Sequence, residues 1–178
     1  MKPADQEDER LLRQVAQGDS AAFATLHRRR YAQVYRFALR VVQAPDRAEE
    51  VTNDTMVTVW SDAERFEFRS KVTTWMFGIA YRTALKSLRR NKRERSQVEL
   101  EKVDNLVSAH EPDIEAVFDK KRVHKALAKL PADLKAVVEL TYFYGFSQQE
   151  IGEILSCPVG TVKSRMHSAR EKLREVLA

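Results

Sequence analysis

Hydrophobic residues recur every three or four positions along most of the first half of the chain, which is the spacing of one buried face of an α-helix. This pattern predicts four helices. The second begins at Asp19, a good N-cap residue, and in the third Asp46 and Glu49 have the spacing of a capping box. The pattern breaks over residues 62–70. The expected helices cover about residues 7–17, 19–42, 45–61 and 70–93.

Residues 96–111 show no helical period and are rich in acidic side chains, so we expect a flexible acidic linker there. Fully extended, such a segment reaches roughly 55–60 Å, and the parts that it joins need not touch. Beyond it, the pattern predicts a helix over about residues 113–129 and another that opens at Leu130–Pro131 and ends before Gly145. The expected fold is all-α, with two small helical domains at residues 1–95 and 112–178.

Two short helices joined by a tight turn are predicted near the C-terminus. Ser147 and Glu150 have the spacing of a capping box, so a helix begins there, and three apolar residues that follow give it one buried face. Pro158 prevents this helix from continuing, and the chain must turn. The last helix is expected to begin near Thr161, another good N-cap residue.

The last predicted helix has two different faces. Val162, Met166 and Ala169 lie on a buried stripe, and the opposite face is polar and basic, which is typical of a DNA-binding helix-turn-helix. Hydroxyl and imidazole groups can meet base edges, while lysine and arginine hold phosphates. The alternative is an ordinary three-helix domain with a solvated basic helix. The candidate DNA contacts are Thr161, Lys163, Ser164, Arg165, His167, Ser168 and Arg170.

Charge is strongly segregated along the chain, although the total is only +5. The net charges are −2 over residues 1–64, +8 over 65–95, −6 over 96–119 and +5 over 120–178. Two basic blocks separated by an acidic one indicate two contacts with a polyanion. Chance clustering on solvated helix faces is the alternative.

The side chains that usually carry catalysis or bind metals are few and scattered. Cys157 is the only cysteine, which excludes an internal disulfide and a cysteine-pair zinc site, and we expect it to be a small apolar filler. The four histidines form no pair at metal-ligand spacing. We therefore expect no cofactor, no metal and no catalytic activity. With no apolar run near the roughly 20 residues that span a bilayer and no secretory signal, we expect a cytoplasmic protein.

At the helix-turn-helix, the sequence resembles the C-terminal domain of extracytoplasmic-function (ECF) sigma factors, the small branch of the sigma-70 family. The matching residues there are Leu130-Pro131, Tyr142, Gly145-Phe146-Ser147, Glu150-Ile151, Leu155 and Val159-Gly160-Thr161-Val162-Lys163-Ser164-Arg165. The upstream half matches at 46–55, at Phe66, Ser70 and Thr74-Trp75, and at Ile79-Ala80, Ala84-Leu85 and Leu88-Arg89-Arg90. The resemblance covers about residues 20–95 and 115–177. Asn53-Asp54 depart from the usual Gln-Glu pair, and Arg82 and Lys86 stand where Asn and Asp are frequent.

The resemblance implies an RNA polymerase sigma factor that binds core polymerase and directs promoter-specific initiation. The acidic helix would bind the polymerase clamp through Asp46, Glu49, Glu50, Asn53 and Asp54. The basic fourth helix and the loop before it would read and melt the downstream (minus-ten) element through Phe66, Phe68, Arg69, Ser70, Lys71, Arg82, Lys86, Arg89 and Arg90. The helix-turn-helix would read the upstream (minus-thirty-five) element.

The implied partners are core RNA polymerase, double-stranded and locally melted promoter DNA, and an anti-sigma factor, with no membrane and a monomeric free chain. Aromatic rings stack on unpaired bases, although Phe66 and Phe68 have anchoring of the loop in the core as their alternative. Trp60 and Trp75 lie on the apolar stripes of their helices, and we expect both in the core. The linker is similar to one that threads the polymerase interior near the RNA path, and a passive spacer is its alternative.

Two other classes of protein compete with this interpretation. A helix-turn-helix regulator that binds DNA as a dimer without polymerase needs a dimerisation helix or a receiver domain, and neither is evident in the sequence. A DNA-processing enzyme needs a cluster of metal-binding carboxylates in its basic half. Only Glu67 and Glu94 are acidic in the basic block at 65–95, which disfavours the enzyme.

Overall fold

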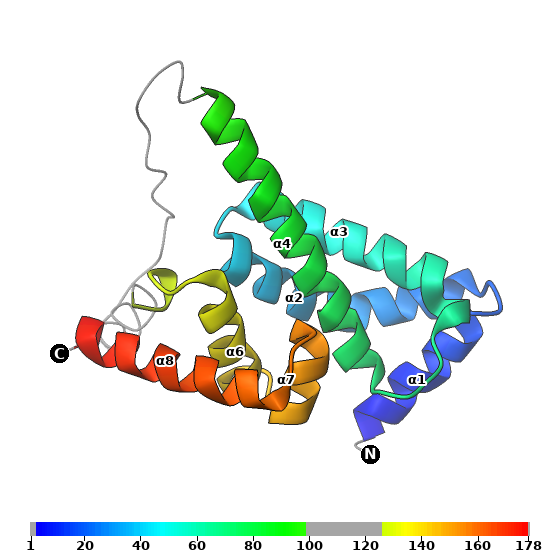
Figure 1. Cartoon of the computed structure of the whole chain (residues 1–178). Coiled ribbons are helices and arrows are strands. Elements are labelled where there is room, and N and C mark those ends of the chain that lie inside the picture. Colours follow the sequence, from blue (N-terminus) through cyan, green and yellow to red (C-terminus); the bar gives the residue numbers. More distant parts are fainter. Residues whose placement is uncertain (1–2, 99–125, 178) are drawn as a thin grey trace, which may run out of the picture.

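The computed structural model describes residues 3–98 and 126–177, with side chains described for 3–93 and 126–175. All of the regular structure in these ranges is helical (Figure 1). The first half contains α1 (Pro3–Val15), α2 (Ser20–Val42), α3 (Pro45–Asp62), a short 3-10 turn η1 (Ala63–Arg65) and α4 (Val72–Val98). The four helices expected from the sequence are confirmed, although α1 begins four residues earlier than expected and α4 runs into the segment predicted to be linker.

The ends of α2 and α3 follow from local chemistry. Asp19 caps α2, since its Oδ1 accepts hydrogen bonds from the backbone N–H groups of Ala21 and Ala22 at 2.9 and 3.0 Å. Gln43 ends α2 in the left-handed conformation (φ +55°). The capping box expected at Asp46 and Glu49 is wrong. The N-cap residue of α3 is Ala44, which has no capping side chain, and Pro45 supplies the helical φ of the first turn instead.

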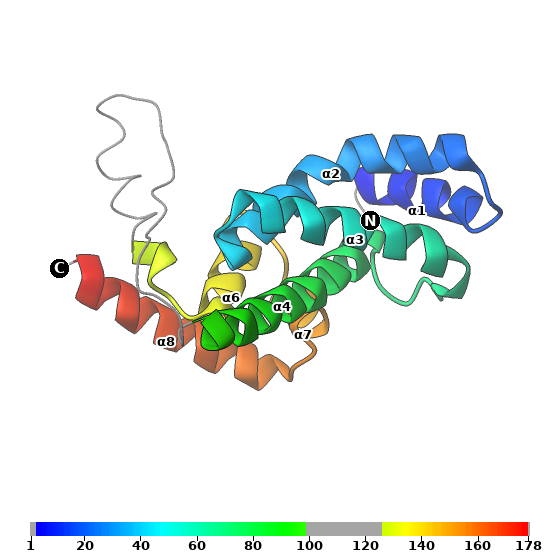
Figure 2. The ribbon, with the colours of Figure 1, turned by 90° about the horizontal axis from the view of Figure 1, so that it is seen from above.

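The core of the first half lies where α2, α3 and α4 meet. Figure 2 shows α2 and α3 side by side, with α4 packed along them. Phe37 and Phe77 are the largest fully buried side chains in the described residues. Trp60, which we expected in the core, is 40 % exposed, and its ring meets that of Phe23 edge-on at a centroid distance of 5.2 Å.

The second half contains α6 (Ala132–Tyr142), α7 (Gln148–Leu155) and α8 (Val159–Leu177), preceded by a helical turn at 126–128. The capping box of α7 is confirmed: Ser147 Oγ accepts from the Glu150 N–H at 3.2 Å, and Glu150 Oε2 accepts from the Ser147 N–H at 2.8 Å. The last helix begins at Val159, two residues before the expected Thr161. Most of the helix expected over 113–129 lies outside the described residues.

The two halves pack against each other in this structure. Figure 1 shows α7 against α4 and α6 beside α2. Tyr144 and Phe146, which connect α6 to α7, meet Phe77 of α4 at ring-centroid distances of 4.8 and 5.1 Å. The division into separable domains at 1–95 and 112–178 stays a prediction, and residues 99–111 of the expected linker lie outside the described residues.

Candidate nucleic-acid and polymerase-binding surfaces

The start of α8 presents the polar surface expected of a recognition helix. Val162, Met166 and Ala169 are buried, while the other side of the helix faces solvent. Thr161 is half-buried and its carbonyl accepts a hydrogen bond from Ser164 Oγ at 3.0 Å. The fully exposed members of the candidate upstream set are Lys163, Ser164, His167, Ser168 and Arg170.

Two arginines of α8 contact α6: Arg170 Nη2 donates a hydrogen bond to the hydroxyl of Tyr142 at 3.0 Å, and Arg165 forms an ion pair. Its side chain is only 27 % exposed, its Nε lies 3.3 Å from Asp133 Oδ2 on α6, and its Nη1 lies 3.7 Å from the sulfur of Cys157. The guanidinium therefore fastens the start of α8 to α6 and to the turn before α8. This contact was not predicted from the sequence, because Asp133 lies 32 positions earlier in the chain.

A close backbone approach sets the angle between α7 and α8. A Cβ atom placed on Gly152 would lie 2.9 Å from the carbonyl oxygen of Cys157, closer than real Cβ atoms come to backbone. Ser156 then ends α7 in the left-handed conformation (φ +52°). Glycine at position 152 thus allows the tight turn that brings α8 across α7.

The loop before α4 is held by an aromatic stack. The ring of Phe66 stacks on Trp75 of α4 at 4.6 Å and 28°, and the ring of Phe68 meets Phe66 edge-on at 4.8 Å. Both phenylalanines are half-buried and packed in the loop, while their contact with an unpaired base stays a prediction. Beside them lies a hollow of about 300 Å³. Its lining includes Arg65, Phe66, Glu67, Arg69, Ser70 and Trp75.

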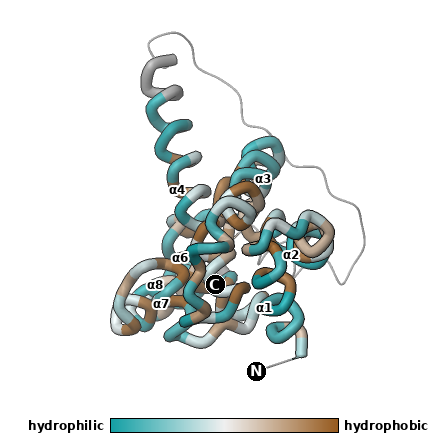
Figure 3. The backbone as a smooth tube through the Cα atoms, turned by 90° about the vertical axis from the view of Figure 1, so that its right-hand side faces the viewer, coloured by the Kyte–Doolittle hydropathy of each residue, from teal (hydrophilic) through white to brown (hydrophobic). Residues whose placement is uncertain are grey.

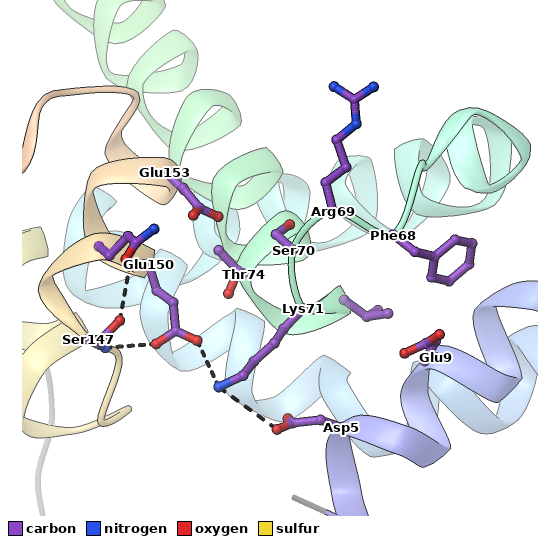
Figure 4. Close-up of a pocket in the computed structure, with 12 residues that line it drawn as sticks. Asp5, Glu9, Phe68, Arg69, Ser70, Lys71, Thr74, Ser147, Glu150 and Glu153 are labelled. Carbon is purple, nitrogen blue, oxygen red and sulfur yellow. Dashed lines mark hydrogen bonds and ion pairs between the residues drawn. The ribbon is translucent and has the colours of Figure 1, made fainter. Parts of the chain in front are cut away.

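Lys71 lies at the junction between the loop, α1 and α7. Figure 4 shows its ammonium group between two carboxylates, 2.8 Å from Glu150 on α7 and 3.9 Å from Asp5 on α1. The hydrogen bond to Glu150 raises the pKa of Lys71. Lys71, a predicted DNA contact, is therefore bound to the second half of the chain in this structure. Lys71 and Thr74 both line a second hollow, of about 530 Å³, and the buried hydroxyl of Thr74 has no hydrogen-bond partner among the described residues.

The outer part of α4 carries the rest of the downstream set. Arg82, Lys86, Arg89 and Arg90 are all exposed, and Figure 3 shows how hydrophilic this part of α4 is. Arg90 forms a bidentate ion pair with Glu50 of α3, with Nη2 2.7 and 2.9 Å from the two carboxylate oxygens. This hydrogen bonding lowers the pKa of Glu50. One candidate polymerase contact and one candidate DNA contact are thus partners of each other.

The outer face of α3 combines acidic and apolar side chains. The five candidate polymerase contacts Asp46, Glu49, Glu50, Asn53 and Asp54 are all exposed. Val57 is 64 % exposed and Trp60 40 %, and both lie on the next turns of the helix. An apolar patch with a polar rim is typical of protein–protein interfaces. Val57 was missed in the sequence, where its position off the buried stripe of α3 was the available signal.

Within the described ranges, the structure contains no group of three or more His, Cys, Asp or Glu side chains that could hold a metal ion. Among the same residues, no helix is both long and apolar enough to span a membrane.

Comparison with known proteins identifies both halves. Residues 26–94 match the family model of sigma-70 region 2, and residues 120–173 match that of sigma-70 region 4. The ECF RNA polymerase sigma factor RpoE of Cereibacter sphaeroides is 31% identical over 162 residues, which cover 88% of this chain and 87% of that protein. The ECF RNA polymerase sigma factor SigW of Bacillus subtilis is 28% identical, over 93% of this chain and 94% of its own.

A solved structure agrees with these sequence matches. The sigma factor RpoE of Bartonella quintana, crystallised in complex with the anti-sigma factor NepR, superposes with a TM-score of 0.74 at 28% identity. The match covers 87% of this chain and 96% of that one.

A helix-turn-helix with an exposed polar and basic face, together with an acidic and apolar surface on another helix, is typical of a transcription factor that also binds a protein. The order of the two matched regions makes the class specific: the chain belongs to the ECF branch of the sigma-70 family of RNA polymerase sigma factors. The fold class and the function expected from the sequence are confirmed. The regulator without polymerase is set aside, since region 2 accounts for the first half.

Proposed function

We propose that this sigma factor uses three surfaces during initiation: α3 for core polymerase, the start of α8 for the upstream element, and the loop at 66–71 with α4 for the downstream element. The observation that carries the proposal is the separation of charge on these surfaces. The acidic side chains gather on α3, and exposed basic side chains gather on α4 and α8. DNA and a protein partner can then be bound at the same time.

On α8, the exposed hydroxyls of Ser164 and Ser168 and the imidazole of His167 read base edges in the major groove. Lys163 and Arg170 hold phosphates on the flanks. Arg165 holds a phosphate only by giving up its ion pair with Asp133, so its replacement weakens both DNA binding and the packing of α8. Thr161, half-buried in the first turn of α8, completes the candidate set on this surface.

In the first half, Arg69 and Ser70 line the hollow beside Phe66 and contact an unpaired base of the melted strand there. Lys71, Arg82, Lys86, Arg89 and Arg90 follow the phosphate backbone. Phe68 serves mainly to hold the loop. On α3 the apolar pair Val57 and Trp60 extends the polymerase surface beyond its five polar members.

Promoter opening by this chain uses binding energy, without catalysis, cofactor or metal, in the cytoplasm. The free chain is a monomer. An anti-sigma factor is a further partner, since the structurally similar RpoE of Bartonella quintana is bound to one. The residues at 1–95 and 112–178 act as two domains, because two elements on one promoter require two readers at a distance from each other.

The experiment is a selection from a randomised promoter library with reconstituted polymerase. Replacing Ser164, His167 and Ser168 with alanine should change the preferred upstream sequence and leave the downstream preference intact. Each lost base contact should cost about 1–3 kcal/mol of binding free energy at the upstream element. Lys172→Ala, an exposed change farther along α8, is the control and should change neither preference. If the triple variant keeps the upstream preference of the wild type, the assignment of α8 is wrong.

A further inference from the structure

The N-terminal helix α1 reaches the loop that precedes α4. The guanidinium carbon of Arg13 lies 3.7 Å from the ring centroid of Phe68, a close cation–π contact. Glu9, one turn earlier on α1, holds the same guanidinium, with 2.7 Å between its Oε1 and Arg13 Nη2. Neither residue lies within the matched region 2, which begins at residue 26.

Phe68 needs an external support of this kind. Its φ is +56°, in the left-handed region that a bulky side chain rarely adopts. Such a conformation persists only where surrounding contacts determine it. On one side the ring meets Phe66, which in turn stacks on Trp75, and on the other it meets Arg13. A continuous stack therefore runs from α1 through the loop to the first turn of α4.

The residues beside this stack are the ones assigned to the melted strand. Arg69 and Ser70 follow Phe68 directly, so the backbone conformation of Phe68 determines where their side chains point. If Phe68 returned to an ordinary φ, both side chains would be redirected away from the hollow that they line.

We propose that Arg13 is a positioning residue for the downstream-element loop: oriented by Glu9, it holds Phe68 in the left-handed conformation that presents Arg69 and Ser70 to an unpaired base. The inference rests on the proposed function of this loop. It assigns to α1 a role in promoter opening that acts through Phe68, without contact between Arg13 and DNA.

The test compares Arg13→Ala with Arg10→Ala in the full chain with core polymerase. Arg10 is a matched control, since it is an exposed arginine of α1 in an ion pair with Glu7, and its recorded contacts stay within that helix. Arg13→Ala should lower the equilibrium for open complexes two- to fivefold, corresponding to about 0.5–1 kcal/mol, while Arg10→Ala leaves it unchanged. Permanganate reactivity of thymines in the melted region reports open complexes, and core binding should be equal for all variants.

A double-mutant cycle shows whether Arg13 acts through Phe68. In a Phe68→Ala background, Arg13→Ala should have no further effect. Additive losses would overturn the proposal, and so would equal behaviour of the two arginine variants. If Arg13→Ala flattened the slope of log DNA affinity against log salt concentration by about one unit, Arg13 itself would contact a phosphate, and the proposal would be overturned. If wild-type chain fails to open any promoter with core polymerase, the proposed function has failed and not the role of Arg13 alone.

Discussion

A buried ion pair connects the two halves of the chain, and its disruption has a predictable cost. Arg40 Nη1 of α2 lies 3.1 Å from Glu139 Oε1 of α6. Glu139 is 1 % exposed, and its Oε2 has no hydrogen-bond partner among the described residues. Burial raises the pKa of Glu139 in spite of the attraction of Arg40. Replacing Arg40 with methionine keeps much of the packing and leaves the carboxylate buried without the guanidinium, with the charge of Lys135 still lowering its pKa.

Removing one partner of a buried ion pair typically costs 3–5 kcal/mol. Since the side chain of Arg40 is 28 % exposed, solvent screens the pair and we expect a cost below that range, about 2–3 kcal/mol in the free energy of unfolding. For a chain of this size that corresponds to a decrease in Tm of roughly 4–12 °C. Glu139→Gln should cost less, because it removes the charge that burial disfavours and keeps an acceptor for Arg40.

The pH dependence follows from the pKa of Glu139. Arg40 lowers this pKa, so the methionine variant has a higher one than the wild type. The part of the variant's deficit that comes from the ion pair is therefore complete above the higher pKa and shrinks as the pH falls from the higher pKa towards the wild-type pKa. It is lost below the wild-type pKa, where the carboxyl is protonated in both proteins. Thermal unfolding followed by far-UV circular dichroism from about pH 8 to about pH 5 measures it.

Arg28→Met is the control, since Arg28 is exposed on the same helix and its recorded side-chain contact is with Thr25 on α2 itself. It should leave Tm within about 1–2 °C of the wild type. If Arg40→Met did the same, or if its deficit did not change with pH, the ion pair would not connect the two halves in solution.

Three other predictions concern the turn of the helix-turn-helix, the loop and α3. Gly152→Ala should cost about 1–3 kcal/mol of stability by overpacking against the Cys157 carbonyl, whereas Gly160→Ala, with open space around it, should be neutral in the same denaturant titration. Glu150→Gln keeps the capping interaction but removes the nearer of the two carboxylates beside Lys71. The free chain should then bind single-stranded downstream DNA about two- to fivefold more tightly by anisotropy, and unchanged affinity contradicts this. Charge reversal on α3 should weaken binding to core polymerase at least about tenfold, while the helix content measured by circular dichroism stays that of the wild type. Retained affinity would remove α3 from the interface. The reversed residues are Glu49, Glu50 and Asp54.

Much of the fold could be predicted because it depends on local sequence. The helices follow from the spacing of apolar residues, and the capping box at Ser147 and Glu150 involves residues only three positions apart. The position of Trp60 could not be predicted in this way. An apolar period shows which residues share a helix face, whereas burial depends on which other helix covers that face, and little of the chain covers the end of α3.

The contacts that define the sites depend on residues far apart in the chain. The cation–π contact of Arg13 with Phe68, the left-handed φ of Phe68 and the ion pair of Arg165 with Asp133 leave no periodic signal in the sequence. Residue types and local spacing therefore predict which side chains are candidates for contact with DNA and polymerase, and this assignment stays a prediction. They could not predict which of those side chains the protein uses for its own packing.

The central claim is most directly tested by mixing the purified chain with core RNA polymerase of its host and a library of genomic DNA fragments. We expect one chain to co-elute with each core enzyme in gel filtration, and the complex to start transcripts at a limited set of sites that share one upstream and one downstream element. Core enzyme alone should not start there. A chain that binds these fragments by itself, but neither co-elutes with core polymerase nor changes where transcripts start, would contradict the account.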